Sequence, residues 1–298
     1  MTSEVRISAQ QVKELREKTG APMMDCKSAL TEAQGDMAAA EIVLRKRGIA
    51  VAQKKAGRTA IEGLIGAVVR PDRSAGALLE INCESDFVAR TDDFQELMRN
   101  LLKRVIGQTL PDVTALLALP YGCDGQPSQT VKDAVAAKVG KLGENIVVRR
   151  LVHYARAENG WFGSYLHHGK IGVLVEASCD RPGGEALKEV AKDLAMHIAA
   201  SDPRFIRRED VDAETLRQER EIQRERARAE GKPEKVLDKI LEGRMCKFFE
   251  EICLLEQPFI RDTNMSVGQW LASRAAETGA VTVTRFTRFK VGEGIIKE

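Results

Sequence analysis

The sequence predicts an α+β protein, and three observations lead to this class. The first fifty residues contain three short amphipathic segments that each end at a glycine. A strand-like pattern then occurs twice, at residues 76–83 and 172–179, and an amphipathic helical segment follows each copy. Two charge-rich helical segments come later in the chain. Short strands joined by short loops favour antiparallel pairing, and helices packed on one face of such sheets define the α+β class.

The N-terminal segments are expected to form three small helices, at residues 8–19, 22–34 and 36–47. Ser8 and Gln11 can form a capping box, and the glycines at positions 20, 35 and 48 are stop signals. The predicted core of this domain consists of apolar residues at helical spacing: Val12, Leu15, Leu30, Ala33, Val43 and Leu44. Residues 51–59 are rich in Lys and Arg and are predicted to form a solvated basic linker.

The middle of the chain is predicted to be a duplicated core. The run Gly-Ala-Leu-Leu-Glu-Ile-Asn-Cys at 76–83 is echoed by Gly-Val-Leu-Val-Glu-Ala-Ser-Cys at 172–179. Each half is expected to be a strand hairpin followed by a helix. The other expected elements are strands at 63–69 and 160–166, helices at 94–105 and 187–199, a strand at 146–154 in the second half, and a strand at 281–291 that returns to the second sheet.

A helical hairpin is predicted for the late charged region. Residues 212–230 are dominated by Arg and Glu, Gly231 and Pro233 interrupt the helix, and an apolar stripe begins afterwards. The stripe consists of Leu237, Leu241, Met245, Phe248 and Ile252. The hairpin either exposes a solvated face or pairs with another chain, so a dimer through it stays open. The predicted domain organisation is an N-terminal three-helix domain at 1–55, the two halves of the core at 56–150 and 151–205, the inserted hairpin at 206–250 and a C-terminal return to the core at 251–298.

Composition narrows the class of protein. Lys and Arg number 46 against 44 Asp and Glu, so the net charge of +2 provides no overall attraction to nucleic acid or to an anionic membrane. No apolar run is long enough to span a bilayer and the N-terminus has no apolar signal segment, so we expect a cytoplasmic protein. The six cysteines form no Cys-x-x-Cys pair and are predicted to be buried thiols without chemistry.

The sequence lacks the motifs of common enzyme classes. A nucleotide-binding loop needs glycines followed by Lys-Ser or Lys-Thr, and residues 140–143 (Gly-Lys-Leu-Gly) do not have that spacing. His167 and His168 could bind a metal only with distant partners, so a polar loop or interface role is favoured. We therefore expect a binding protein and not an enzyme, with no cofactor, no metal site and no direct nucleotide binding.

One short segment is a candidate site for binding another protein. Ser85 and Asp86 follow a strand-like run and favour a turn or a helix start, so Phe87 is expected where the chain reverses direction. An outward Phe87 beside a fixed negative charge would suit a protein partner. Alternatively, Phe87 packs in the core on Phe94 or Leu97, and the residues alone leave both interpretations open.

Several segments, in order along nearly the whole chain, resemble the bacterial elongation factor Ts family. They are residues 12–30 (VKELREKTGAPMMDCKSAL), 82–90 (NCESDFVAR), 143–146 (GENI), 171–175 (IGVLV), 195–201 (AMHIAAS), 242–245 (EGRM) and 288–295 (RFKVGEGI). The resemblance implies a nucleotide exchange factor for the GTPase elongation factor Tu in translation elongation. It also implies an N-terminal three-helix domain of the ubiquitin-associated type, a duplicated core and an inserted coiled-coil hairpin.

The resemblance also assigns partner contacts by position. In the family an Asp-Phe pair enters the GTPase between two helices near its magnesium site, which here points to Asp86 and Phe87, flanked by Ser85 and Val88. Ser85 replaces the commoner Thr and keeps the hydroxyl. Secondary contacts by position are Arg16, Met23, Met24, Lys27, Leu142, Gly143 and His167, although core filling is an equal alternative for one of the two methionines. A C-terminal helix that adds a contact in some members is expected to be absent.

Parts of the sequence are also compatible with two other functions. An RNA-binding accessory factor of the ribosome would use Lys54, Lys55, Arg58, Arg149 and Arg150 as phosphate contacts, but the sequence offers no aromatic stacking platform. A structural dimer built on the hairpin at 212–252 would need no GTPase. The expected partner is elongation factor Tu, in a complex of one factor per GTPase or of two plus two, with no membrane or nucleic acid partner.

Overall fold

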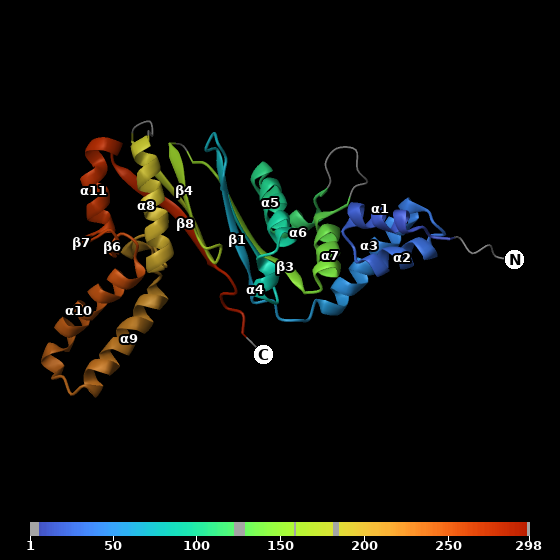
Figure 1. Cartoon of the computed structure of the whole chain (residues 1–298). Helices are drawn as coiled ribbons and strands as arrows, with labels where there is room; N and C mark the ends of the chain where they lie inside the picture. The colour runs from blue at the N-terminus through green and yellow to red at the C-terminus, as the bar shows by residue number, and fades with distance from the viewer. Residues whose placement is uncertain (1–5, 122–128, 158, 181–184, 297–298) are drawn as a thin grey trace. The chain divides into compact units, whose positions relative to one another are not determined.

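The computed structural model describes residues 6–121, 129–157, 159–180 and 185–296. It combines helices with small sheets, which confirms the α+β class. The chain forms two compact units, and Figure 1 labels their elements. The first unit comprises residues 1–66, 77–153 and 289–298, and the second comprises residues 67–76 and 154–288.

The first unit begins with the helices α1 (Ala9–Thr19), α2 (Met23–Glu32) and α3 (Met37–Lys55). Ser8 and Gln11 form the predicted capping box, and Asp36 caps α3 by accepting a hydrogen bond from the Ala39 N–H. The small core follows the predicted pattern, with Val12, Leu15 and Leu30 buried and with Ala33, Val43 and Leu44 packed against them.

The predicted end of the third helix at Gly48 is wrong, because α3 continues to Lys55. Gly48 lies where α3 crosses α7 (Val131–Leu142), and a Cβ at Gly48 would lie 3.5 Å from the Ala136 carbonyl oxygen. A glycine in a helix costs about 1 kcal/mol relative to alanine, and here its small size permits the close approach of two helices. Part of the predicted basic linker is therefore helical.

The first sheet has the strand order β1-β2-β3, formed by β1 (Glu62–Val69), β2 (Ala75–Cys83) and β3 (Ile146–Ala155). The prediction that residues 146–154 belong to the second half is wrong, because β3 lies beside β2 in this sheet. Arg149 and Arg150 of β3 bond the buried carboxylate of Glu80 on β2, at 3.0 and 2.5 Å, and thereby favour this pairing.

Three further helices complete the first unit: α4 (Asp86–Ala89), α5 (Asp92–Gly107) and α6 (Val113–Ala118). The apolar stripe of α5 is buried, as its periodicity predicts, and its members are Phe94, Leu97, Met98, Leu101 and Val105. Lys138 and Lys141 of α7 both donate to Asp93 at the start of α5, at 2.7 and 2.8 Å. These ion pairs fix α7 to α5.

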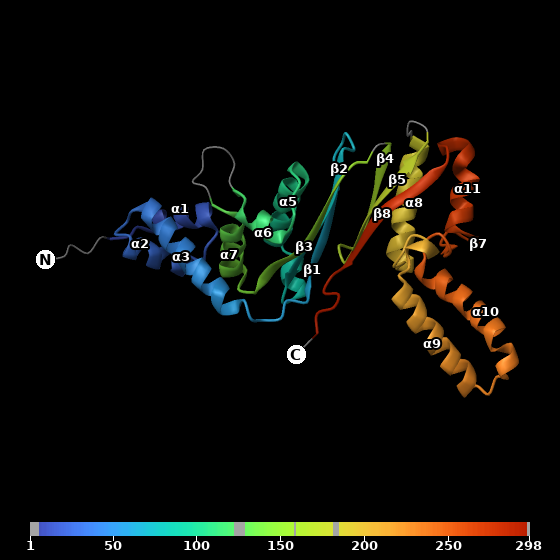
Figure 2. The ribbon, with the colours of Figure 1, turned by 180° about the vertical axis from the view of Figure 1, so that it is seen from behind.

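The second sheet has the order β4-β5-β8, formed by β4 (Gly160–His167), β5 (Ile171–Cys179) and β8 (Val281–Lys290). β4 and β5 pair antiparallel, and β8 lies beside β5, which confirms the predicted return of this strand. Helix α8 (Glu185–Ser201) covers one face of this sheet in both Figure 1 and Figure 2. The core between them contains Val173 and Val175 of β5 and Leu194 and Ile198 of α8.

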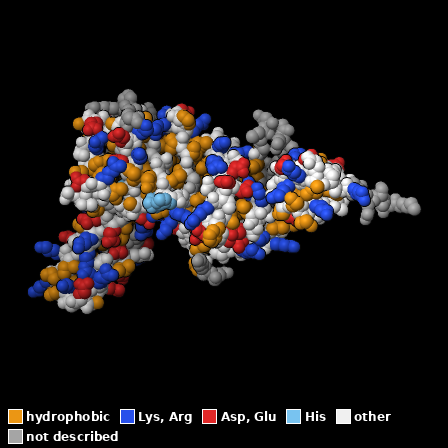
Figure 3. Space-filling model, in the orientation of Figure 1, with side chains coloured by type: hydrophobic (Ala, Val, Ile, Leu, Met, Phe, Trp, Pro, Cys, Tyr) orange, Lys and Arg blue, Asp and Glu red, His pale blue; other side chains and the backbone are white. Residues whose placement is uncertain are grey.

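The remaining elements of the second unit are α9 (Ala213–Ala229), α10 (Glu234–Ile252), β6 (Pro258–Phe259), β7 (Asp262–Ser266) and α11 (Val267–Thr278). Helices α9 and α10 lie side by side as an antiparallel hairpin (Figures 1 and 2). Its second arm buries Leu237, Met245 and Ile252, whereas Ile222 of the first arm is exposed. Figure 3 shows acidic and basic side chains intermixed on this hairpin. No helix in the described part of the chain has both the length and the apolarity to cross a membrane.

The cysteines follow the prediction in part. Cys26, Cys83, Cys179 and Cys253 are buried, whereas Cys246 is exposed on α10, so the prediction is wrong for that residue. Cys246 is exposed because its neighbour in sequence, Met245, lies on the buried face of α10. Cys123 lies outside the described residues. Burial raises the pKa of the Cys253 thiol to about 11, so it stays protonated at neutral pH.

Each unit contains one fully buried glutamate at a corresponding position of the repeated strand. Glu80 on β2 accepts hydrogen bonds from Arg149, Arg150 and the Gly292 N–H. Glu176 on β5 accepts from Arg285 and from the Ala157 N–H, at 2.8 and 2.7 Å. A buried carboxylate needs such partners, because an unpaired charge in the interior is very costly. The Glu80 contacts also hold the chain after β8 at Gly292.

The Glu80 cluster predicts a pH-dependent stability. Burial alone would raise the pKa of Glu80, but the hydrogen bonds from Gly292, Arg150 and Arg149 outweigh burial and hold the pKa below its ordinary value. A lowered native pKa means that the carboxylate stabilises the fold above about pH 4.5 and that this stabilisation is lost as the pH falls further. We expect Glu80→Gln to lower the free energy of unfolding by roughly 2–4 kcal/mol at pH 7 and to weaken the loss on acidification.

Urea unfolding at pH 7 and at pH 4 measures both effects. The exposed Glu242 provides the matched control, and Glu242→Gln should change the free energy of unfolding by less than about 0.5 kcal/mol. Equal stability of Glu80→Gln and the native chain at pH 7 would contradict the assigned role of Glu80.

Candidate functional site

Phe87 points outward from a short helix that begins just after β2 ends. Ser85 is the N-cap of α4, with an extended backbone, and its hydroxyl accepts a hydrogen bond from the Val88 N–H at 3.4 Å. The Phe87 side chain is 78% exposed. The alternative in which Phe87 packs in the core on Phe94 or Leu97 is wrong, because a side chain exposed to this extent is not part of the core.

Two carboxylates, one from each of two chain segments, connect the start of α4 to the end of α7. Glu144 accepts hydrogen bonds from the Ser85 N–H at 2.9 Å and from the Ser85 hydroxyl at 2.5 Å. Glu84 accepts one from the Asn145 N–H at 2.6 Å. Each segment therefore supplies a carboxylate to the backbone of the other. We call these four residues, Glu84, Ser85, Glu144 and Asn145, the carboxylate brace.

The chain that leaves α3 is tied to the carboxylate brace. The Asn145 side-chain amide donates to the Arg58 carbonyl at 2.8 Å, and the Arg58 guanidinium lies 3.6 Å from the Glu84 carboxylate. The Lys55 ammonium donates to the Gly143 carbonyl. The end of the N-terminal helical domain thus meets the turn that carries Phe87.

Asp86 presents a carboxylate next to Phe87. It forms an ion pair with Arg90 at 2.7 Å, and 38% of the Asp86 side chain and 75% of the Arg90 side chain are exposed. Exposed ion pairs of this kind contribute only about 0–1 kcal/mol, so Asp86 can exchange Arg90 for another partner. Val88 on the same turn is half-buried.

The two methionines of the helical domain are both accessible. Met23 and Met24 open α2 and are 53% and 72% exposed, so the alternative in which one of them fills the core is wrong. Arg16 and Lys27 are also exposed. Unbranched, polarisable methionine side chains adapt to irregular surfaces, which suits contact with a protein.

The structure brings Leu142 and Gly143 to the carboxylate brace. Gly143 ends α7 in the left-handed conformation, with φ 75°, and immediately precedes Glu144. Gly20, at the end of α1, lies against the side chain of Lys141 in the last turn of α7. A Cβ atom at Gly20 would lie 2.8 Å from the Lys141 ammonium. The helical domain and the Phe87 turn are therefore both anchored at α7.

His167 belongs to the second unit. It is exposed at the end of β4, with its Nδ1 atom 3.2 Å from the Tyr165 hydroxyl and its ring edge-to-face with His168. Among the described residues no three His, Cys, Asp or Glu side chains are grouped so that they could hold a metal ion.

Three residues of the carboxylate brace were not identified from sequence: Glu84, Glu144 and Asn145. Glu84 lies in the segment 82–90, and Glu144 and Asn145 lie in the segment Gly-Glu-Asn-Ile at 143–146; both segments resemble the family without indicating a role for these residues. Their partners lie about sixty positions away in the chain, so no local pattern could reveal the pairing.

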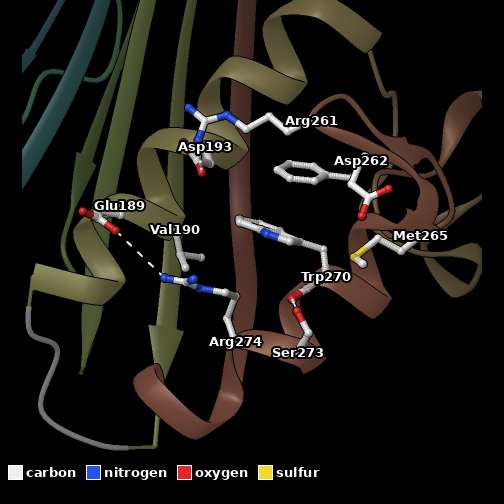
Figure 4. A pocket seen from close by; sticks show the side chains of 10 residues that line it. Glu189, Val190, Asp193, Arg261, Asp262, Met265, Trp270, Ser273 and Arg274 are labelled. Atoms are coloured by element: carbon white, nitrogen blue, oxygen red, sulfur yellow. Dashed lines mark hydrogen bonds and ion pairs between the residues drawn. The ribbon is translucent and has the colours of Figure 1, made fainter.

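A hollow of about 420 Å³ in the second unit is a separate candidate. Figure 4 shows Trp270 between Arg274 on one side and Met265 on the other. The charged residues that line it mainly pair with one another, as Arg261 does with Asp193 at 2.9 Å. Burial nevertheless raises the pKa of Asp193 above its ordinary value. Because its charges are already matched, the hollow shows no clear preference for a charged ligand.

The bases proposed to contact RNA are mostly used within the chain. Lys55 bonds Gly143, Arg58 pairs with Glu84, and Arg149 and Arg150 bond Glu80. Only Lys54 of this set is exposed without a bond described above. This arrangement counts against the RNA-binding alternative, because phosphate contacts require accessible charges.

An exposed aromatic side chain on a braced turn, together with exposed methionines on a separate helix, is typical of a protein that acts by binding another protein. The profile of the family described as Elongation factor TS matches residues 84–293. Proteins named Elongation factor Ts from Trichlorobacter lovleyi and Clostridium tetani are 45% and 47% identical over 297 and 294 residues. These matches cover 98% of this chain and 94% and 95% of those proteins.

A Clostridium botulinum protein named Elongation factor Ts is 44% identical over 293 residues, and the match covers 98% of this chain and 95% of that protein. The chain belongs to the elongation factor Ts family. Membership implies a nucleotide exchange factor for elongation factor Tu in translation elongation, which is a protein that speeds nucleotide release and not a catalyst of a covalent reaction.

The N-cap geometry predicts how the turn responds to substitution of Ser85. Ser85→Ala removes the hydroxyl that bonds Glu144 and the Val88 N–H, so we expect a loss of about 1 kcal/mol in stability and faster hydrogen exchange at Val88. Ser85→Thr keeps the hydroxyl and should behave like the native chain. Urea unfolding and amide exchange of the three chains provide the measurement. Identical exchange in all three would contradict the capping role.

Proposed function

We propose that this chain releases GDP from elongation factor Tu by inserting Asp86 and Phe87 near the magnesium site of the GTPase. The observation that carries the proposal is the 78% exposure of Phe87 on a turn held by four bonded residues. Burial of a Phe side chain in a partner yields about 1.5–3 kcal/mol. Because the turn is already ordered, little of that energy is lost to ordering it on binding.

The chemistry of nucleotide release follows from the partner's metal ion. In a GTPase, Mg²⁺ bridges phosphate oxygens and protein oxygens and neutralises their charge. An apolar side chain inserted between the helices beside the ion displaces its protein ligands, and the adjacent Asp86 carboxylate adds a negative charge near the phosphates. Both effects weaken the binding of Mg²⁺ and GDP. The proposed step requires no covalent chemistry from this chain.

Thermodynamic linkage explains how the cycle ends. If this chain lowers the affinity of the GTPase for a nucleotide by some factor, the nucleotide lowers the affinity for this chain by the same factor. Incoming GTP can then eject the exchange factor and leave the GTPase loaded. A factor that bound equally well with and without nucleotide would leave the affinity of the GTPase for the nucleotide unchanged.

The remaining contacts are proposed to hold the two proteins together. Arg16, Met23, Met24 and Lys27 would grip the GTPase from the helical domain, which is anchored at α7 near the Phe87 turn. Leu142 and Gly143 would extend the same surface beside the carboxylate brace. His167 would form a separate contact from the second unit. Truncation of these residues should weaken complex formation more than the rate of release within the complex.

We expect Phe87→Ala to abolish most of the acceleration of GDP release, because the variant lacks the aromatic side chain that acts as a wedge between the helices of the GTPase. The chain should stay folded, since Phe87 is 78% exposed and absent from the core. The assay follows the release of fluorescent GDP from purified elongation factor Tu over a range of concentrations of this chain. Circular dichroism and urea unfolding check the fold of the variant.

Ile222→Ala is the matched control for Phe87→Ala. Ile222 is another large apolar side chain that is more than half exposed, but it lies on α9 of the hairpin. The Ile222→Ala variant should accelerate GDP release as the native chain does. Normal acceleration by Phe87→Ala would refute the wedge, and no acceleration by the native chain would refute the exchange activity itself.

A further inference from the structure

We propose that Glu144 is a positioning residue for nucleotide exchange: it fixes the direction in which Phe87 points. The inference rests on the proposed function, because it concerns how the wedge is presented. Glu144 itself contacts the backbone and hydroxyl of Ser85 and makes no described contact with Phe87. Its effect on exchange is therefore exerted through Ser85.

The geometry at Ser85 supports this role for Glu144. Both donors of that residue point at one carboxylate, the N–H at 2.9 Å and the hydroxyl at 2.5 Å. Because the hydroxyl donates to Glu144, its lone pairs face the Val88 N–H, from which it accepts a bond at 3.4 Å. Glu144 thereby fixes the side-chain rotamer of the N-cap, and the N-cap fixes the start of α4.

Helix α4 is too short to hold its own orientation. Four residues are far too few to form a stable helix unaided, and only Ala89 among them is buried. Packing therefore provides little to orient this turn. The bonds from Ser85 to Glu144 hold the start of the turn, and the bond from the Asn145 N–H to Glu84 adds a second connection between the same two segments.

A carboxylate suits position 144 better than a neutral side chain. An ionised carboxylate only accepts hydrogen bonds and has two oxygens, so it satisfies the N–H and the O–H of Ser85 at once. Bonds to a charged acceptor are roughly twice as strong as those between neutral groups. A glutamine offers one oxygen and places an NH₂ group against a donor. Glu144→Gln should therefore retain part of the function and Glu144→Ala less.

The experiment compares the native chain with Glu144→Ala, Glu144→Gln and the control Glu242→Ala, which alters an exposed glutamate of α10. Acceleration of GDP release from elongation factor Tu should fall roughly tenfold in Glu144→Ala, less in Glu144→Gln, and not at all in Glu242→Ala. In the free chains, hydrogen exchange of the Ser85 and Val88 amides should quicken in the Glu144 variants only. Urea unfolding identifies any variant that fails to fold, and the milder Glu144→Gln then decides the result.

A double-mutant cycle separates positioning from a general structural role. Affinity for nucleotide-free elongation factor Tu is measured for Phe87→Ala, Glu144→Ala and the double variant. Affinity is used because the double variant should release GDP at nearly the rate seen without any exchange factor. If Glu144 acts through Phe87, the double variant binds as Phe87→Ala does. Additive losses would overturn the proposal, as would native release rates in Glu144→Ala.

The proposed function can fail separately. In that case the native chain does not accelerate GDP release, whereas quickened amide exchange at Ser85 in the Glu144 variants would still support the brace. Unchanged amide exchange in those variants would overturn the positioning role even if the native chain is an active exchange factor.

Discussion

The bonds between Glu144 and Ser85 are the interaction on which the proposed binding surface depends. They join the end of β2 to the end of α7, and the chain leaving α3 is attached at the same place through Asn145 and Arg58. The Phe87 turn, the Leu142 end of α7 and the helical domain with its exposed methionines are thus parts of one connected structure. An exposed apolar side chain is useful to a binding protein only when its direction is fixed before the partner arrives.

Buried carboxylates with bonded partners also stabilise the two sheets. The central strand of each sheet buries a glutamate, and an arginine from a neighbouring strand neutralises it: Arg150 beside Glu80, and Arg285 beside Glu176. A misplaced strand would leave the glutamate buried without its partner, and an uncompensated buried charge is strongly destabilising. Glu80 also bonds the Gly292 N–H, so the chain after β8 is held in the first unit. Charge matching therefore helps to determine which strands become neighbours.

Local sequence signals predicted many of the helices and strands correctly. They failed where contacts between distant residues determine the structure. The capping box at Ser8 and the periodic stripe of α5 predicted helices that the structure contains. Gly48 read as a helix stop, but contact with α7 keeps it helical. The partner of β3 depended on Glu80, nearly seventy positions away, and the role of Glu144 depended on Ser85. The family resemblance supplied Asp86 and Phe87, whereas the exposure of Phe87 required the structure.

The most direct test of the account is a photocrosslink from position 87. The chain is prepared with a photoreactive phenylalanine analogue in place of Phe87 and mixed with nucleotide-free elongation factor Tu, and the crosslinked peptide is identified by mass spectrometry. The account predicts a crosslink to the helices beside the magnesium site of the GTPase, and its loss when excess GTP is added. A crosslink that maps elsewhere on the partner, or one that is indifferent to GTP, would contradict insertion of Phe87 at the nucleotide site.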